Sequence, residues 1–331
     1  MQTFRHWTVP PAKKPKIEME TFHKWNVLIP ELRAHCLSYS SNEDLHRYAK
    51  CSKLCNYEIQ KFNSVAPWSV SLSELNNDGE DGMVVELEYQ WNHQVQWFFA
   101  RHDEKHYKLT RHFIHLDKSH YYLIMEGNAR EAAFQYVADR YKYVKTGVSS
   151  NVYLDCKDWR GEWRTIQGIC RADCWMIRLY PSMHEECLNA LTNNSSINQL
   201  RLYTEPGNPG NICLPSQFFK SPLFKQLERG IFNVKSSIHS DDFLASKAYY
   251  LELECDTISG IAINTKIQKW FNGEMDKCTF VISSSGIVNI DDVVFNLPFV
   301  HVVNQFRIER FDGKRGLLKR KNNTISFWSS R

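Results

Sequence analysis

Two short segments of this sequence combine residue types that bind metal ions in enzymes. The first is HDEKH, residues 102–106, in which two histidines flank an acidic pair. A zinc-protease helix needs a glutamate directly after its first histidine, because only that spacing turns the carboxylate toward the metal-bound water. Here Glu104 comes two residues after His102, and the flanking residues have strand character. We therefore interpret HDEKH as a turn between two strands.

The second segment is CRADC, in which Cys170 and Cys174 are followed by His184 and Cys187. Structural zinc sites use ligand pairs that are two to four residues apart, so the spacing of the first pair is acceptable. His184 and Cys187, however, lie in a segment with helical spacing. We favour cysteines packed in the core and keep a zinc site as the alternative.

No other pattern in the sequence indicates catalysis. It contains no glycine-rich phosphate loop, nucleophile elbow or dinucleotide fingerprint. Asp241-Asp242 and Asp291-Asp292 precede helix-like segments, where acidic residues complement the helix dipole. We expect a protein that is not an enzyme and that uses no metal or cofactor. An enzyme with an unrecognised cysteine or zinc centre is the competing hypothesis.

Composition limits the class of partner. Of 331 residues, 43% are hydrophobic and 24% are charged, and the net charge is only +4. These values are typical of a globular protein and predict no nucleic-acid partner. The sequence has no apolar stretch of membrane length and no signal peptide, so we expect no membrane partner and a cytoplasmic and/or nuclear location. The ten cysteines are then expected to be free thiols.

Two basic segments have alternative interpretations. Residues 1–22 are polar and lack any period, which predicts a flexible arm. Its cluster Lys13-Lys14-Pro15-Lys16 is either a nuclear import signal or, as we favour, part of a solvated tail. KRGLLKRK, residues 314–321, is either a solvated hairpin face, which we favour, or a contact for phosphate or an acidic peptide.

A small helical module is predicted over residues 23–66. Ser41 and Asp44 form a capping box, so a second helix is expected to begin there. The first apolar stripe comprises Leu28, Ile29, Leu32, Cys36 and Leu37, and the second comprises Leu45, Tyr48, Ala49 and Leu54.

The residues from 80 to 331 are expected to form a separate domain of α+β or α/β class. Runs over 83–91, 94–102, 106–116 and 120–127 predict an antiparallel β region, followed by a helix over Asn128–Val144. Strands then alternate with helices every twenty to thirty residues, which predicts an irregular leucine-rich-repeat-like arc with a parallel sheet. Asp312-Gly313 and Asn322-Asn323 suit hairpin turns, so a closing β-meander is expected after residue 306. The strands of the arc are predicted over 151–156, 175–180, 199–203, 232–237, 250–255 and 278–283, and the helices over 183–192, 215–227, 239–246 and 263–273.

The segment LIPELRAHCLSYSSNEDLHRYAKCSK, residues 28–53, resembles an F-box. That family has an apolar residue before a proline, a leucine two positions later, an apolar pair, an acidic-leucine step and a serine-lysine pair. Cys36 departs from the pattern because larger aliphatic residues are usual there, and Tyr39-Ser40 replace an expected apolar residue. The matching positions are Ile29-Pro30, Leu32, Cys36-Leu37, Asp44-Leu45 and Ser52-Lys53.

The rest of the chain is similar to nematode F-box proteins that carry an F-box-associated domain. INTKIQKWFNGEMDKCTFVI, residues 263–282, looks like that family's helix with its W-x-x-G step and returning strand. FRIERFDGKRGLLK, residues 306–319, looks like its closing strand pair with a central Asp-Gly-Lys.

The resemblance implies the substrate-recognition subunit of a Skp–cullin–F-box ubiquitin ligase. The F-box would dock a Skp-type adaptor, and through it a cullin, while the second domain would bind an unknown protein substrate. The competing possibility is a non-ligase scaffold with a decayed F-box. The implied adaptor-binding residues are Leu28, Ile29, Pro30, Leu32, Cys36, Leu37, Leu45 and Leu54.

Two segments after predicted strands are candidates for substrate contact. DWRGEWR, residues 158–164, and YTEPGNPGN, residues 203–211, contain glycine or proline and predict projecting loops. Aromatic and arginine side chains dominate interface energetics, although both tryptophans are more readily explained as a cover over the core. The candidate substrate-binding residues are Trp159, Arg160, Trp163, Arg164 and Tyr203.

Overall fold

The chain divides into two compact units, residues 1–65 and 66–331. The computed structural model describes residues 48, 51, 55, 69–75, 81–89, 93–112, 122–141, 151–157, 172–181, 184–192, 197–204, 212–286, 288–303 and 305–330. In the first unit this leaves three residues, Tyr48, Cys51 and Cys55, all in helical conformation. The architecture below is that of the second unit.

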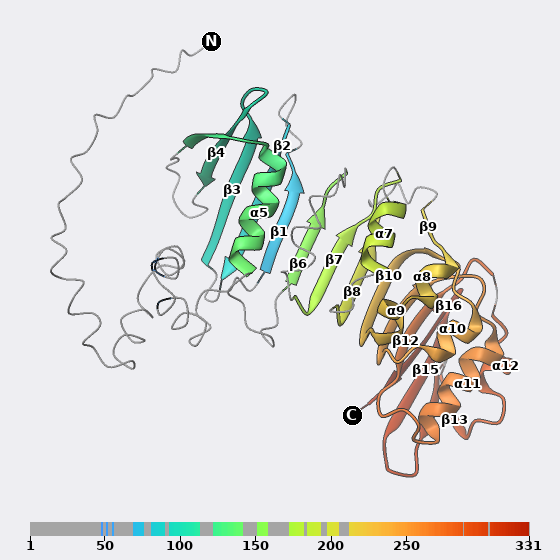
Figure 1. Ribbon diagram of the computed structural model, residues 1–331. Coiled ribbons are helices and arrows are strands. Elements are labelled where there is room, and N and C mark those ends of the chain that lie inside the picture. Colours follow the sequence, from blue (N-terminus) through green and yellow to red (C-terminus); the bar gives the residue numbers. More distant parts are fainter. Residues whose placement is uncertain are drawn as a thin grey trace, which may run out of the picture. The chain divides into compact units, whose positions relative to one another are not determined.

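The second unit is a mixed α/β structure with one large sheet (Figure 1). The strand order is β13-β14-β15-β16-β12-β11-β10-β8-β7-β6-β1-β2-β3-β4-β5, and β9 pairs with β10 beside this path. The strands are β1 (Ser69–Glu74), β2 (Gly82–Tyr89), β3 (His93–Arg101), β4 (His106–His112), β5 (Tyr122–Glu126), β6 (Asn151–Asp155), β7 (Cys174–Arg178), β8 (Gln199–Tyr203), β9 (Cys213–Leu214), β10 (Arg229–Ser236), β11 (Tyr250–Glu254), β12 (Thr279–Ser283), β13 (Phe299–Val302), β14 (Gln305–Glu309), β15 (Arg315–Lys321) and β16 (Thr324–Ser329).

The middle of the sheet is parallel and both flanks are antiparallel. Strands β1, β6, β7, β8, β10, β11 and β12 run parallel to their neighbours in this series. Strands β1 to β5 form one antiparallel flank, and β12 with β16 to β13 forms the other. The predicted antiparallel region and the predicted closing meander are both present, and the predicted parallel strands lie between them.

The helices pack on the strands from one side (Figure 1). One row of paired residues shows why, since Val152, Trp175, Leu200, Gly230, Leu251 and Phe280 follow one another across the parallel strands, and the side chains of all but the glycine are fully buried. Aromatic and aliphatic side chains of this row form one continuous core with the helices. The helices are α5 (Ala129–Tyr141), α7 (His184–Thr192), α8 (Ser216–Lys220), α9 (Pro222–Gln226), α10 (Ser240–Ala245), α11 (Gly260–Phe271) and α12 (Ile290–Val294).

Three strands of the sheet lie where the sequence predicts none, namely β1, β13 and the two-residue strand β9. Strand β1 begins at Ser69, in a segment whose proline and serines are typical of a loop. It also lies before residue 80, where the second domain was expected to begin. It pairs with β2 and β6, so the sheet starts earlier than predicted. Strand β13, Phe299–Val302, is an exposed four-residue edge with too short a pattern to read as a strand.

The helical segment predicted over 215–227 is two short helices. Ser221 between them has an extended conformation because Pro222 disfavours the helical region at the residue before it. The Ser221 hydroxyl accepts a hydrogen bond from the Phe224 amide at 3.2 Å and donates one to the Phe218 carbonyl at 2.6 Å. The break thus becomes a cap that serves both helices.

The turns of the closing meander match their predicted chemistry. Gly313 has a φ of 82° and Asn322 a φ of 53°, the left-handed conformations that these residue types tolerate best. None of the helices in the described parts of the chain combines the length and the apolar character that a membrane span requires.

Lys266 in α11 is buried, with 1% of its surface exposed. Its Nζ donates hydrogen bonds to the carbonyls of Phe243 at 2.8 Å and Ser246 at 3.0 Å, at the C-terminal end of α10. These carbonyls have no partner within their own helix, so the lysine stabilises the end of α10. Burial lowers the pKa of Lys266 from the ordinary 10.5 to about 8.

This lowered pKa predicts a pH dependence. Between about pH 8 and about pH 10.5 the unfolded chain binds more protons at Lys266 than the folded chain, so stability rises with pH in this window. We expect the free energy of unfolding of the wild type, relative to Lys266→Met, to increase by about 2 kcal/mol from about pH 7.5 to about pH 10. Other titrating groups cancel in this difference, which chemical denaturation measures. A difference that stays constant with pH would contradict the assignment.

Candidate protein-binding surface

The structure describes one of the five candidate substrate-binding residues. Tyr203 ends β8 and is half-buried. The other four and the implied adaptor-binding residues remain predictions. Outside the described residues lie Trp159, Arg160, Trp163, Arg164, Leu28, Ile29, Pro30, Leu32, Cys36, Leu37, Leu45 and Leu54.

Tyr203 lies on the face of the parallel strands that is opposite to the core row. Burial alternates along these strands, so that every second side chain is half-buried on this second face. We call it the open face. The residues used below to describe it are Tyr153, Asp155, Cys174, Met176, Arg178, Gln199, Arg201, Tyr203, Arg229, Ile231, Tyr250 and Glu252.

At one end of the open face, Tyr203 belongs to a neutralised cluster. The Arg178 guanidinium is 5.5 Å from the centre of the Tyr203 ring, and its Nη1 lies 2.8 Å from an Asp155 oxygen. Tyr180 donates its hydroxyl to the same carboxylate, and burial together with this hydrogen bond raises the pKa of Tyr180 to about 12. Burial also raises the pKa of Tyr203. The charge of Arg178 is therefore compensated within the protein.

Near the middle of the open face, two arginines lack such compensation. The Arg229 guanidinium is 4.7 Å from the centre of the Tyr250 ring, and its Nε is buried without a hydrogen-bond partner. The Arg201 side chain makes no hydrogen bond or ion pair with any described residue. Both arginines are near Cys174, where their charges oppose the effect of burial, which raises the pKa of that thiol.

Sequence reasoning missed Arg201 and Arg229 because it looked for binding residues in loops. A usable pattern was present in QLRLY, residues 199–203, where leucines alternate with Gln199, Arg201 and Tyr203. Such alternation places the three polar side chains on one face of a strand. It does not show that Arg229, on another strand, lies beside them.

The described residues cover only part of the candidate zinc site. No group of three or more histidine, cysteine, aspartate or glutamate side chains that could hold a metal occurs among them. Cys187 is buried and Cys174 half-buried, while Cys170 lies outside the described residues. Burial raises the pKa of Cys156, Cys255 and Cys278 to about 12, which disfavours the reactive thiolate form.

HDEKH forms the turn between β3 and β4 that the sequence predicts. The Asp103 carboxylate accepts hydrogen bonds at 2.8 Å from the amides of Lys105 and His106. It also lies 2.9 Å from the His106 ring Nδ1. The hydrogen bond from the Lys105 backbone amide lowers the pKa of Asp103 most, and the hydrogen bond with the His106 ring lowers it further. These contacts describe a capped turn.

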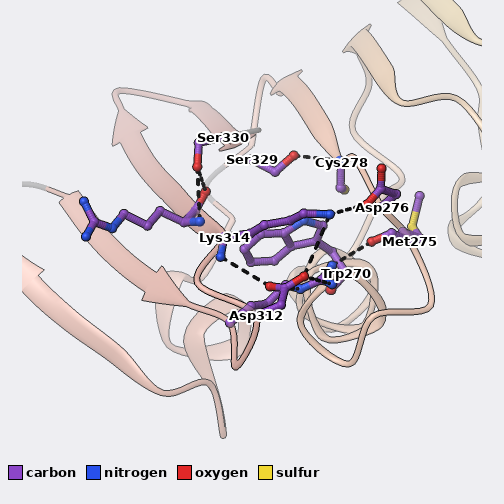
Figure 2. Close-up of polar contacts among 10 residues, drawn as sticks. Trp270, Met275, Asp276, Cys278, Asp312, Lys314, Ser329 and Ser330 are labelled. Carbon is purple, nitrogen blue, oxygen red and sulfur yellow. Dashed lines mark hydrogen bonds and ion pairs between the residues drawn. The ribbon is translucent and has the colours of Figure 1, made fainter.

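The two segments that carry the F-box-associated resemblance meet in space (Figure 2). Arg310 at the end of β14 donates through Nη1 to the carbonyls of Trp270 at 2.9 Å and Met275 at 3.0 Å. Its Nε and Nη2 donate to Asp312 at 3.1 and 2.6 Å. The guanidinium also lies 5.5 Å from the centre of the Trp270 indole. Arg310 thus fastens the closing meander to the end of α11.

A second set of contacts surrounds this arginine. Lys314 forms an ion pair with Asp276, and the Cys278 amide donates to the Ser329 hydroxyl at 2.9 Å (Figure 2). Lys314 is therefore paired within the protein rather than presented to a ligand. Of the other cations of KRGLLKRK, Lys319 lies 5.7 Å from the Trp328 ring centre.

The closing meander also carries an apolar groove of about 980 Å³. It lies over β13 to β16, where several large apolar side chains are exposed. Among its lining residues are Phe299, Val300, Val302, Leu317 and Trp328.

Comparison with models of protein families finds no match to this chain. Neither curated proteins nor solved structures give a significant match.

Proposed function

We propose that this protein is the substrate-recognition subunit of a Skp–cullin–F-box-type ubiquitin ligase. The observation that carries the proposal is the F-box-like order of residues between Ile29 and Lys53. It falls within residues 1–65, the first compact unit, and so precedes a second unit that has a core of its own. This division is what a docking module joined to a recognition domain requires.

The finer architecture is proposed on similar grounds. We infer an F-box helical hairpin in the first unit and a leucine-rich-repeat-like strand–helix arc in the second. Helices connect β7 to β8, β10 to β11 and β11 to β12, and each pair of strands is parallel and adjacent. Repetition of one strand–helix unit is the basis of such repeat architectures, and it leaves the other face of the sheet open for a protein ligand.

A helical module of about forty residues buries too little apolar surface to offset its own loss of conformational entropy. Its apolar stripe therefore needs cover from a partner, and a Skp-type adaptor would provide that cover by packing helices against it. The adaptor would join the protein to a cullin, and the second unit would hold the protein to be ubiquitinated. No catalytic role, metal or cofactor is part of this proposal.

Cys36 favours a second candidate function, because the family uses larger aliphatic residues there. A smaller side chain weakens docking, and a decayed F-box would leave a protein-binding scaffold outside the ligase pathway. Capture of a Skp-type adaptor by the wild-type chain separates the two functions.

The double variant Pro30→Ala/Leu32→Ala tests the proposal. Truncation of a buried leucine costs about 2–5 kcal/mol, and about 1.4 kcal/mol corresponds to a tenfold change in affinity. We expect the variant to lose adaptor capture by at least about 30-fold in a pull-down with purified adaptor.

Ile261→Ala/Phe295→Ala is the matched control, because it removes two exposed apolar side chains from the second unit. This control is expected to capture the adaptor as the wild type does, and both variants are expected to keep the thermal unfolding of the second unit. Undiminished capture by Pro30→Ala/Leu32→Ala, or no capture by the wild type, would refute the ligase role.

A further inference from the structure

Arg201 and Arg229 present unpaired positive charge on the open face. We propose that this place binds an extended, anionic segment of a protein partner, whose carboxylate or phosphate groups contact the two guanidinium groups. The proposal rests on the proposed function only in regarding that partner as the protein to be ubiquitinated. The binding site itself follows from the chemistry of the face.

The carboxylates near the two arginines either pair with other side chains or make no contact with the arginines. Asp155 pairs with Arg178 at 2.8 Å. Glu252 accepts a hydrogen bond from the Tyr250 hydroxyl at 3.1 Å and forms no ion pair with a described cation. No described carboxylate therefore neutralises Arg201 or Arg229.

This lack of a partner is unfavourable for cations that are partly withdrawn from water. Withdrawal from water disfavours a charge that has no counter-charge, and a buried N–H without an acceptor costs free energy. The Nε of Arg229 is such an N–H. A bound carboxylate or phosphate would supply acceptors for it, and guanidinium groups bind both anions in a two-point geometry.

The spacing of the two arginines predicts the form of the ligand. They stand on the neighbouring strands β8 and β10, where Arg201 pairs with Ile231 and Arg229 pairs with Gln199. One step across strands and two along them put their Cα atoms roughly 8 Å apart. Alternate residues of an extended peptide are roughly 7 Å apart and point to the same side. The site therefore fits a segment with anionic side chains at positions i and i+2.

The neighbouring side chains suit a peptide more than a free anion. Tyr153, Tyr203 and Tyr250 lie on the same face as the arginines. Tyrosine and arginine are among the residue types that contribute most to protein interfaces, because they combine apolar area with directed hydrogen bonds. Met176 pairs with Tyr153 on one side and with Arg201 on the other. The tyrosines and Met176 therefore offer apolar contacts beside the charges.

Fluorescence anisotropy with the full chain tests the proposal. The probes are three labelled peptides, alike except that the alternate positions i, i+2 and i+4 hold glutamate, phosphoserine or glutamine. Binding is expected for the glutamate peptide, the phosphoserine peptide or both, and the one that binds identifies the natural anion. It is expected to weaken as salt increases. Binding of neither anionic peptide, equal binding of the glutamine peptide, or tighter binding of an oligothymidylate would overturn the proposal.

Arg201→Gln/Arg229→Gln is expected to lower the affinity for the anionic peptide at least about tenfold, since each charge-assisted contact contributes about 1.5 kcal/mol or more. Arg307→Gln/Arg320→Gln removes the same charge from exposed positions of the closing meander and is expected to leave affinity unchanged. Equal loss in both variants would show non-specific attraction and overturn the proposal.

Cys174 gives a measurement that needs no variant. It stands on the open face beside both arginines, so the bound peptide should slow its alkylation in the wild type, as mapped by mass spectrometry. Unchanged alkylation at saturating peptide would count against the site. Adaptor capture by Arg201→Gln/Arg229→Gln is expected to stay at the wild-type level. Failed capture by the wild type would end the ligase role while leaving this site intact.

Discussion

Trp270→Ala is expected to lower the free energy of unfolding by about 3–5 kcal/mol. The indole is 0% exposed in the last turn of α11. Its ring centre lies 5.2 Å from that of Phe327 in β16, in an edge-to-face arrangement, and the Arg310 guanidinium covers it at 5.5 Å. Alanine would leave a cavity between the helix and the closing meander that these neighbours cannot fill without moving. Chemical denaturation followed by circular dichroism measures the loss.

Trp328→Ala is the matched control, because it makes the same chemical change in the neighbouring part of the meander. Trp328 is 38% exposed and its ring contacts the flexible Lys319 side chain. We expect a loss of about 1 kcal/mol. Similar losses for the two tryptophans would contradict the central place assigned to Trp270.

Arg310→Met is expected to lower the free energy of unfolding by about 3 kcal/mol. The arginine is only 7% exposed, and methionine keeps much of its apolar stem. The variant would leave the Met275 carbonyl without its donor and Asp312 without its two-point partner, while the Trp270 carbonyl would keep the hydrogen bond from the Gly273 amide. An unsatisfied buried acceptor costs about 1–3 kcal/mol, and the loss of the charge-assisted bonds to Asp312 adds to this cost.

Arg315→Met supplies the comparison for this variant. The Arg315 side chain is 77% exposed and lies 3.8 Å from Glu309. An exposed ion pair contributes less than about 1 kcal/mol, so we expect little change. If Arg310→Met were as mild as Arg315→Met, the fastening of the meander to α11 would be wrong. Trp270 and Arg310 are in contact, so their combined effect is expected to be smaller than the sum.

Trp270 and Arg310 show which contacts join the two segments that resemble the F-box-associated domain. The W-x-x-G step begins at Trp270 in the last turn of α11 and turns the chain at Gly273, which has a φ of 84°. The Asp-Gly-Lys segment supplies Asp312 and Lys314, which hold Arg310 and Asp276. Each segment therefore contributes one half of the junction between the last helix–strand unit and the closing meander.

The sequence by itself determined the elements whose pattern lies within a few residues. Strand β8 has the predicted bounds, and α11 begins three residues before the predicted segment because Ser259 caps it. The turns at Gly313 and Asn322 were also predictable, since a left-handed conformation is a property of a single residue. The mixed α/β class followed from the change of period along the chain.

Strand order was decided only by the tertiary structure. Strand β1 lies beside β6, although β2 to β5 and α5 separate them in the sequence, and it closes the gap between the antiparallel and parallel parts of the sheet. Its core-facing residues Val70 and Leu72 are typical of any strand. Which neighbour covers them depends on where the whole intervening segment folds.

The tertiary structure likewise decided which residues meet on the open face and at the junction around Arg310. The alternation in β8 indicates that Arg201 and Tyr203 share a face, but Arg229 comes 28 positions after Arg201 and joins it through β-pairing. In the sequence Arg310 is one polar residue of a closing hairpin, whereas its partners Trp270 and Met275 come from α11 and from the segment that follows this helix. Local periodicity reflects backbone geometry over a few residues, whereas charge compensation and burial depend on residues brought together by the packed chain.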